Sequence, residues 1–183
     1  ILKSILKIEG GPENIEEFNK ADIEVKTIRL KENEMPKEDI SFPAFEFTKI
    51  INQNFEDSDF YKLISKKFLF VFFKFSGEKL LLKSVKFWNM PIQDIKECEK
   101  VWNETISRIR SGNIVKDITD KGVRKTFFPG KKFNFVSHVR PHAKNKYDCN
   151  KLPVPDNKTK ATEYTKHCFW LNASYVKNNI YRN

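Results

Sequence analysis

Short hydrophobic stretches with the two-residue period of strands, and one long stretch with the period of a helix, alternate along this chain of 183 residues. The clearest helix is predicted at 91–110, because Pro91 stands at its beginning, Gly112 follows its end and an apolar stripe runs along one face. The stripe consists of Ile92, Ile95, Cys98, Trp102, Ile106 and Ile109. The run 68–73 is apolar throughout, which predicts a fully buried strand.

Weaker patterns predict the remaining elements. Strands are expected at 40–47, 80–88, 133–140 and 164–171, and helices at 1–8, 47–55, 59–66 and 175–181. A hairpin turn is expected at 76–79, and polar loops at 31–39 and 141–160. The segment 114–132 is interpreted as a short helix followed by a basic loop. Together these elements predict an α+β fold (mixed α/β), organised as a single domain over residues 1–183.

One predicted strand carries candidate chemistry. The segment 22–30 alternates between charged and apolar residues, so Asp22, Glu24 and Lys26 are expected on one strand face. From Ile28 onward the same face is apolar and is expected to enter a core. Two carboxylates and a lysine so placed can hold a divalent cation and activate a water for phosphodiester hydrolysis. An ordinary solvated strand face has the same pattern, so both interpretations stay open at this point.

The composition favours a folded protein with a polyanionic partner. The hydrophobic share is 39% and the aromatic share 14%, which indicates a globule. Thirty-four Lys and Arg against 24 Asp and Glu give a net charge of +10, which suits nucleic acid or an acidic membrane surface. A lysine-rich proteome produces the same excess without such a partner. Because no 18-residue apolar run occurs, we expect no transmembrane helix. We also expect a bacterial cytoplasmic protein without a membrane partner.

The cysteine pattern indicates a reducing compartment. Cys98, Cys149 and Cys168 are widely spaced and form no CxxC motif, so a disulfide framework is not expected. The last two cysteines and the three histidines contain the ligand types of a zinc site, but their spacings match none of the usual patterns. The chain begins inside a helical pattern without Met, and we expect it to be part of a longer polypeptide.

A basic stretch, HVRPHAKNK at 138–146, ends one predicted strand. Arg140 can donate two hydrogen bonds to guanine O6 and N7 in the major groove, and Lys144 and Lys146 suit phosphates. A solvated basic loop has the same composition. The sequence contains no glycine-rich phosphate loop, no GxSxG motif and no Cys/His pairing that would place a nucleophile.

Five blocks in the same order resemble the MutH family of GATC-specific endonucleases. The blocks are ADIEVKTIRL, KEDISFPAFEF, KFLFVFF with the later VKFWNMPIQDI, HVRPHAKNK, and TKHCFWLNASYV. More closely, they resemble the C-terminal half of a type II restriction enzyme that carries two MutH-like domains in one chain. The resemblance implies a restriction-endonuclease-type fold, with a central mixed sheet flanked by helices and a DNA cleft between two lobes.

The family's catalytic pattern is an Asp, six residues, then Glu-x-Lys. By this resemblance Glu24 and Lys26 fall on the Glu and the Lys, while Glu17 stands at the Asp and is longer by a methylene. Lys3 stands near a further family glutamate. If the chain cuts DNA, the resemblance implies that Glu17 and Glu24 are its Mg²⁺ ligands. By the same spacing Asp22 is a bystander.

The resemblance implies four DNA-binding residues, Glu38, Arg140, Pro141 and Trp170, and the basic stretch adds His142, Lys144 and Lys146 to the predicted set. In this set, Arg140 and Pro141 fall on a guanine-contacting turn, and Glu38 on an acid that accepts a hydrogen bond from cytosine N4. Trp170 falls on an aromatic residue, Tyr in the mismatch-repair members, that contacts the site. The DNA-reading positions therefore match the family better than the cutting positions do.

From this difference the sequence predicts a GATC-binding effector domain of a type IIE restriction endonuclease. Its partners would be double-stranded DNA containing GATC and the N-terminal catalytic domain of the same polypeptide, which it supports allosterically. The alternative is an active Mg²⁺-dependent type II site-specific deoxyribonuclease that uses Glu17, Glu24 and Lys26. A third interpretation is a basic module that binds nucleic acid without sequence preference.

Overall fold

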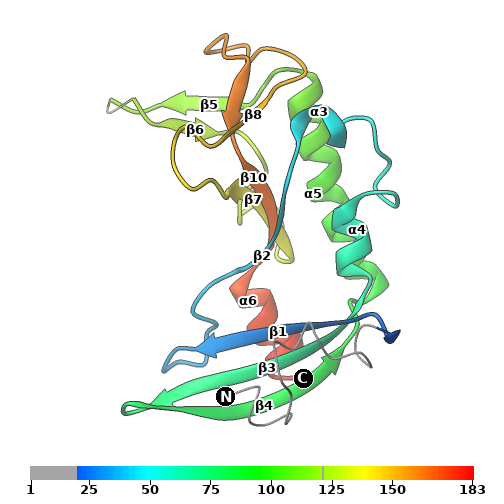
Figure 1. Ribbon diagram of the computed structural model, residues 1–183, viewed down its shortest axis with the longest axis vertical. Helices are drawn as coiled ribbons and strands as arrows, with labels where there is room; N and C mark the ends of the chain where they lie inside the picture. The colour runs from blue at the N-terminus through cyan, green and yellow to red at the C-terminus, as the bar shows by residue number, and fades with distance from the viewer. Residues whose placement is uncertain (1–19, 121) are drawn as a thin grey trace. The chain divides into compact units, whose positions relative to one another are not determined.

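The computed structural model describes residues 20–120 and 122–183, so the helix predicted at 1–8 lies outside the described residues. The chain divides into two compact units, which Figure 1 shows as ribbons. The first unit comprises 1–38, 64–91 and 173–183, and the second comprises 39–63 and 92–172. The chain therefore passes from one unit to the other four times. The single domain over 1–183 stays a prediction.

The sheet of the first unit has the order β1-β3-β4. Its strands are β1 (Ile23–Leu30), β3 (Lys67–Ser76) and β4 (Lys79–Trp88). β1 runs parallel to the central strand β3, and β4 runs antiparallel to it. Gly77 has a φ of +59°, which makes the tight turn between β3 and β4 possible and confirms the predicted hairpin. All six residues of 68–73 are buried, as predicted.

Both faces of β3 carry apolar side chains. On one face Phe68 and Phe70 contact Trp88 of β4, and Phe72 contacts Tyr181. Tyr181 ends the C-terminal helical segment, which consists of α6 (Ala173–Tyr175) and the π-helix η2 (Val176–Tyr181). A helix predicted at 175–181 is therefore confirmed, with the wider π winding over most of its length. The other face is a cluster of Leu69, Val71 and Phe73 with Ile23, Val25 and Leu80 against it.

The second unit contains an antiparallel sheet with the order β2-β10-β7. Its strands are β2 (Ile40–Phe45), β7 (Ser137–Pro141) and β10 (His167–Leu171). Every residue of the central strand β10 is buried. Helix α5 (Ile92–Arg110) contacts β7. Its predicted stripe is confirmed at Cys98, Trp102, Ile106 and Ile109, which are buried. At Ile92 the prediction is wrong, since this first residue of the helix is 71% exposed.

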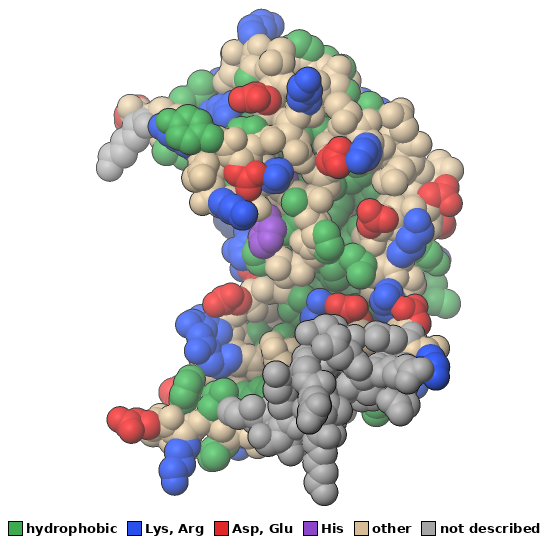
Figure 2. Space-filling model, in the orientation of Figure 1, with side chains coloured by type: hydrophobic (Ala, Val, Ile, Leu, Met, Phe, Trp, Pro, Cys, Tyr) green, Lys and Arg blue, Asp and Glu red, His purple; other side chains and the backbone are tan. Residues whose placement is uncertain are grey.

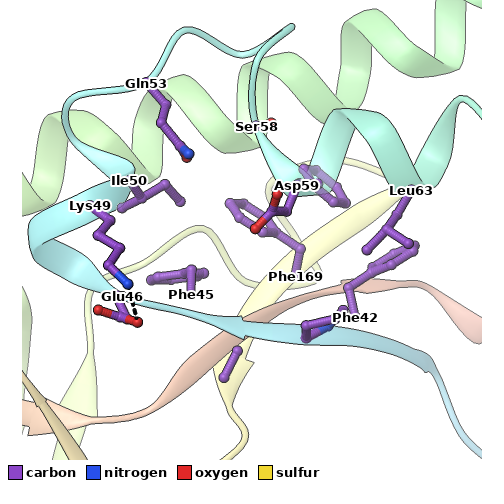
Figure 3. Close-up of a pocket in the computed structure, with 13 residues that line it drawn as sticks. Phe42, Phe45, Glu46, Lys49, Ile50, Gln53, Ser58, Asp59, Leu63 and Phe169 are labelled. Carbon is purple, nitrogen blue, oxygen red and sulfur yellow. Dashed lines mark hydrogen bonds and ion pairs between the residues drawn. The ribbon is translucent and has the colours of Figure 1, made fainter.

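Two short helices, α3 (Phe47–Ile50) and α4 (Asp59–Ile64), follow β2. The predicted helix 47–55 is thus much shorter than expected. The Phe60 ring stacks on Phe169 with centroids 4.1 Å apart, and Phe42 meets Phe60 edge-on at 5.3 Å. Figure 3 shows the small pocket that β2, α3 and α4 leave beside these rings, with the Glu46–Lys49 ion pair near it.

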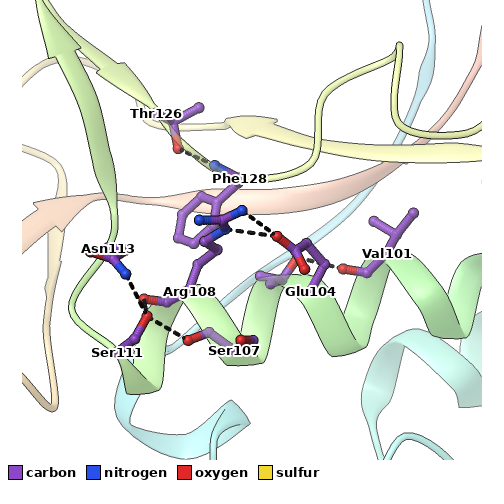
Figure 4. Close-up of polar contacts among 9 residues, drawn as sticks. Val101, Glu104, Ser107, Arg108, Ser111, Asn113, Thr126 and Phe128 are labelled. Carbon is purple, nitrogen blue, oxygen red and sulfur yellow. Dashed lines mark hydrogen bonds and ion pairs between the residues drawn. The ribbon is translucent and has the colours of Figure 1, made fainter.

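The short helix predicted in 114–132 is wrong. β5 (Val115–Ile118) and β6 (Arg124–Thr126) form an antiparallel hairpin instead. The spacing of Ile114, Val115 and Ile118 fits a helix, but β-branched residues favour a pleated strand. Figure 4 shows the polar contacts at the base of this hairpin, where the Phe128 N–H donates to Thr126 Oγ1 at 3.2 Å. Beside it, Nε and Nη2 of Arg108 in α5 both lie 2.7 Å from Glu104 Oε1.

Three further boundaries differ from the prediction. The predicted loop 141–160 contains β8 (Cys149–Lys151), which pairs with β9 (Glu163–Thr165), so the strand predicted at 164–171 is divided between β9 and β10. The strand predicted at 133–140 begins only at Ser137. Asn134 Oδ1 accepts the N–H groups of Val136 and Ser137, both at 3.0 Å, and these local bonds compete with a strand ladder.

The helix α5 ends where the sequence predicts. Gly112 has a φ of +68°, and a Cβ at this position would lie 2.8 Å from the Pro155 carbonyl oxygen. Glycine is therefore required here both by the backbone conformation and by the close approach of another segment. None of the helices in 20–120 and 122–183 is both long enough and apolar enough to cross a membrane.

Candidate nucleic-acid interface

A buried carboxylate gathers basic side chains in the second unit. Asp39 directly precedes β2, and its side chain is only 3% exposed. Lys131 Nζ lies 2.9 Å from Asp39 Oδ1 and 2.7 Å from Oδ2. Arg140 Nη1 lies 3.3 Å from the same Oδ2, and His138 Nε2 lies 3.9 Å from it. These four residues together with Trp170 are called the Arg140 cluster below.

The pairing of β7 with β10 brings His138, Arg140 and Trp170 of this cluster together. His138 is opposite Trp170 and Arg140 is opposite Cys168, so Arg140 and Trp170 are diagonal neighbours on one sheet face. The Arg140 Cζ lies 3.8 Å from the centroid of the Trp170 ring, a cation–π contact. His142 meets the same ring edge-on at 5.3 Å. The Arg140 side chain is nevertheless 41% exposed, so its guanidinium is both held and accessible.

His138 supplies shape rather than charge. Its Nδ1 lies 2.6 Å from Asn172 Oδ1, while Asn172 Nδ2 donates to the Asn134 carbonyl at 3.2 Å. Asn172 Oδ1 is therefore an acceptor, and Nδ1 of His138 carries the proton. Burial lowers the pKa of His138 to about 4, so the imidazole is neutral at pH 7. Its Nε2 has no hydrogen-bond partner within the described part of the chain.

Four further predicted DNA-binding residues lie at the end of β7 and in the loop after it. Pro141, His142, Lys144 and Lys146 are all exposed. Asp148 fixes this loop, because its Oδ2 accepts the Lys144 N–H at 3.0 Å and its Oδ1 lies 2.6 Å from Lys166 Nζ. The Lys166 bond, followed by the Lys144 bond, lowers the pKa of the Asp148 carboxyl. Figure 2 shows Lys and Arg side chains beside the histidine on the visible face of this unit.

The adjacent acids Glu38 and Asp39 differ in burial. Glu38, the acid expected to contact cytosine, is exposed at the end of a first-unit segment. Asp39, which sequence reasoning missed, is buried in the Arg140 cluster. Lys131 and Asn172 were missed as well. Successive residues of an extended chain point to opposite sides, so one of two adjacent acids faces inward, but the sequence does not say which.

Two of the three candidate catalytic residues, Glu24 and Lys26, lie on β1 in the first unit. Lys26 Nζ is 2.8 Å from Glu24 Oε1, which confirms that the two side chains share a face. Ile28 and Leu30 continue that face and are buried, as predicted. Asp22 departs from the prediction, because it precedes the strand with a φ of +50° and its Oδ1 pairs with Lys66 Nζ at 2.7 Å. The predicted set of three charges is therefore reduced to two.

A Mg²⁺ site is incomplete in what the structure describes. Glu17 lies outside the described residues, and Glu24 is the one predicted metal ligand within them. In residues 20–120 and 122–183, no group of three or more His, Cys, Asp or Glu side chains is placed to hold a metal ion. These residues alone do not fit Mg²⁺, which needs several oxygen ligands in near-octahedral geometry.

The residues considered for zinc have other surroundings. His167 Nδ1 donates to the Thr165 carbonyl at 2.6 Å, and its ring stacks on Tyr164 with centroids 5.1 Å apart. Burial lowers the pKa of His167 to about 4 and raises the pKa of the Cys168 thiol to about 12. Both side chains are therefore neutral parts of the core.

A mixed α+β fold of small sheets, with a Glu-x-Lys pair on a strand, is consistent with the restriction-endonuclease class. Residues 6–100 match the family described as DNA mismatch repair enzyme MutH, and the chain belongs to this family. It is also 30% identical over 214 residues to the Type II restriction enzyme Sau3AI of Staphylococcus aureus. That alignment covers 98% of this chain but 44% of the relative, so the chain spans less than half of its length.

Proposed function

We propose that the chain is a sequence-specific DNA-binding effector domain that recognises GATC in double-stranded DNA. In this role it supports a separate catalytic domain of the same polypeptide, as in a type IIE restriction endonuclease. The observation that carries the proposal is the Arg140 guanidinium, which lies 3.8 Å from the Trp170 ring and 3.3 Å from Asp39 while 41% of its side chain stays exposed.

Such a guanidinium suits guanine recognition. It carries five N–H donors in a rigid plane, and two parallel donors match O6 and N7 of guanine in the major groove. A good bidentate contact discriminates against other bases by about 1–3 kcal/mol. Stacking on Trp170 limits the conformations of the side chain, so less entropy is lost when a base is bound.

The charge of the segment that contains Arg140 supports a DNA partner. Residues 114–172 contain thirteen Lys and Arg against five Asp and Glu, which accounts for most of the chain's excess. Exposed lysines such as Lys144 and Lys146 suit phosphates, which position a protein on DNA without reading its sequence. Binding is therefore expected to weaken steeply with salt, because neutralised phosphates release counterions.

Two observations favour an effector over a nuclease. Glu17 stands where the family pattern has the shorter Asp, and Lys3 stands near the position of a family glutamate. The relative is more than twice as long as this chain, which leaves room for a second domain in the same polypeptide.

The binding half of the proposal is tested with fluorescently labelled duplexes. The wild-type chain is expected to bind a GATC duplex about tenfold or more tightly than a scrambled one. Arg140→Ala should remove that preference while it changes scrambled binding little. Equal loss on both duplexes would instead identify a basic module without sequence preference.

The second candidate function is a Mg²⁺-dependent site-specific deoxyribonuclease, which the Glu24–Lys26 pair on β1 favours. A supercoiled plasmid with GATC sites, incubated with Mg²⁺ and the wild-type chain, distinguishes the two. We expect no cleavage. Cleavage that Lys26→Ala abolishes would overturn the effector proposal and establish the nuclease.

A further inference from the structure

The acidic residue Asp39 lies within a surface where DNA binding would favour basic residues alone. The Asp39 side chain is 3% exposed, whereas its partners Lys131 and Arg140 are 55% and 41% exposed. The carboxylate therefore lies beneath two cations that reach solvent. Lys131 is 92 residues away in sequence, so only the tertiary fold brings this pair together. A buried charge is strongly unfavourable unless it is paired, and here the pairing is with the residues that would meet DNA.

The contacts of Arg140 restrict its guanidinium in two directions. Asp39 Oδ2 approaches Nη1 at 3.3 Å, and the Trp170 ring lies against the guanidinium, 3.8 Å from Cζ to the ring centroid. One contact fixes an edge of the plane and the other fixes a face. The carboxylate is near one terminal nitrogen, which leaves the donors on the other nitrogens for a ligand.

We propose that Asp39 is a positioning residue that sets sequence specificity: its buried carboxylate, shared by Arg140 and Lys131, holds the Arg140 guanidinium on Trp170 in the orientation that reads guanine and lowers affinity for DNA of other sequences. The inference rests on the proposed GATC binding. Affinity for any DNA grows with the number of cations that meet phosphates, whereas discrimination needs a donor pair in a fixed orientation. Asp39 cancels one positive charge, which lowers the affinity for any DNA, and it fixes the orientation of Arg140, which increases discrimination.

The test compares the wild-type chain with Asp39→Asn, a variant of nearly the same size without the charge. GATC binding should weaken and scrambled binding should strengthen, so that the ratio of the two affinities falls about tenfold. The salt dependence of scrambled binding should become steeper by about one released counterion. A matched control is Asp117→Asn, which removes an acid paired with Lys158 at 3.2 Å on β5. It should leave the ratio unchanged.

A modified duplex separates orientation from charge. Replacement of the GATC guanines by 7-deazaguanine removes N7, one of the two acceptors for Arg140. The wild-type chain should lose affinity for this duplex, and Asp39→Asn should bind the normal and modified duplexes about equally. If Asp39→Asn keeps the wild-type discrimination for both duplex pairs, Asp39 has no positioning role.

Failure of the proposed function and failure of the Asp39 inference give different results. If the wild-type chain does not prefer GATC, the proposed function fails first; if it does and Asp39→Asn keeps the same ratio, only the present inference fails. Should Asp39→Asn not fold, NMR relaxation of the Arg140 Nε–H group in the free wild-type chain decides, with Arg140→Lys used to assign the signal. An ordered group supports the proposal, and a group that moves freely on the nanosecond timescale overturns it.

Discussion

Two ion-paired sites with different construction lie in the two units of this protein. On β1, Glu24 and Lys26 are neighbours on a strand, both partly exposed, and they pair one to one at 2.8 Å. In the Arg140 cluster, one buried carboxylate serves cations from distant parts of the chain, and a Trp ring fixes one of them. The first pair follows from local alternation alone and contributes little energy. The second depends on the tertiary fold, so its loss would have wider effects.

The largest expected effect comes from removal of the ring that supports Arg140. Trp170→Ala should lower the free energy of unfolding by about 3–5 kcal/mol, because a large buried side chain leaves a cavity on the central strand β10. Urea denaturation measures the change. Trp170→Tyr should recover most of both stability and GATC preference. If the alanine variant is as stable as the wild type, the cluster is not part of the second unit's core.

Acid should affect the second unit through its buried histidines. His138 and His167 have a pKa of about 4 in the folded protein against 6.5 for an unperturbed histidine. The unfolded chain therefore takes up more protons below pH 6.5, and stability is lost as pH falls from 6.5 to 4. At pH 4 and below, each histidine lowers the free energy of unfolding by up to about 3 kcal/mol.

Urea denaturation at several pH values measures this loss. His167→Gln should flatten the profile. All three histidines of the chain belong to the second unit, so the described core of the first unit should not share this dependence. An unchanged slope in His167→Gln would contradict the proposed effect of burial.

Arg140→Lys tests the difference between charge and shape. Lysine keeps the positive charge but lacks the planar fork, so the preference for GATC over scrambled DNA should fall by about 1–3 kcal/mol with little change in salt dependence. Arg124→Lys is the control, since Arg124 also lies over an aromatic ring, that of Tyr164, at 4.8 Å. Anisotropy titrations at two salt concentrations give both quantities.

The smallest effect is expected on β1. Glu24→Gln and Lys26→Met should each change the free energy of unfolding by about 1 kcal/mol or less, because the pair is partly exposed and local. GATC preference should stay at the wild-type value. A large loss of preference in either variant would show that the two sites act together in DNA binding.

Local patterns predicted much of the fold. The buried run 68–73, the stripe of α5 and the shared face of Glu24 and Lys26 all follow from periodicity, which the structure confirms. The β5–β6 hairpin was missed because its apolar spacing fits a helix equally well. Strand β8 was missed because it lies in a polar segment and its pairing partner β9 follows more than ten residues later.

The Arg140 cluster shows what a single sequence does not contain. Arg140 was predicted from its residue type and neighbours, and Trp170 from family resemblance. Their contact depends on the register between β7 and β10, and the pairing with Asp39 and Lys131 depends on three separate segments. Such long-range placement leaves no periodic pattern in the sequence. Arg140 was therefore predicted, but its partners Asp39 and Lys131 were not.

The four crossings of the chain between its two units have a consequence for how such a protein can change during evolution. No single break in the gene separates the unit with Glu24 from the unit with Arg140. A duplication, fusion or exchange must therefore carry both units together. If one copy in a duplicated gene stops cutting DNA, its strand β1 must still be kept, because all eight of its residues pair with the central strand β3 of that unit's sheet.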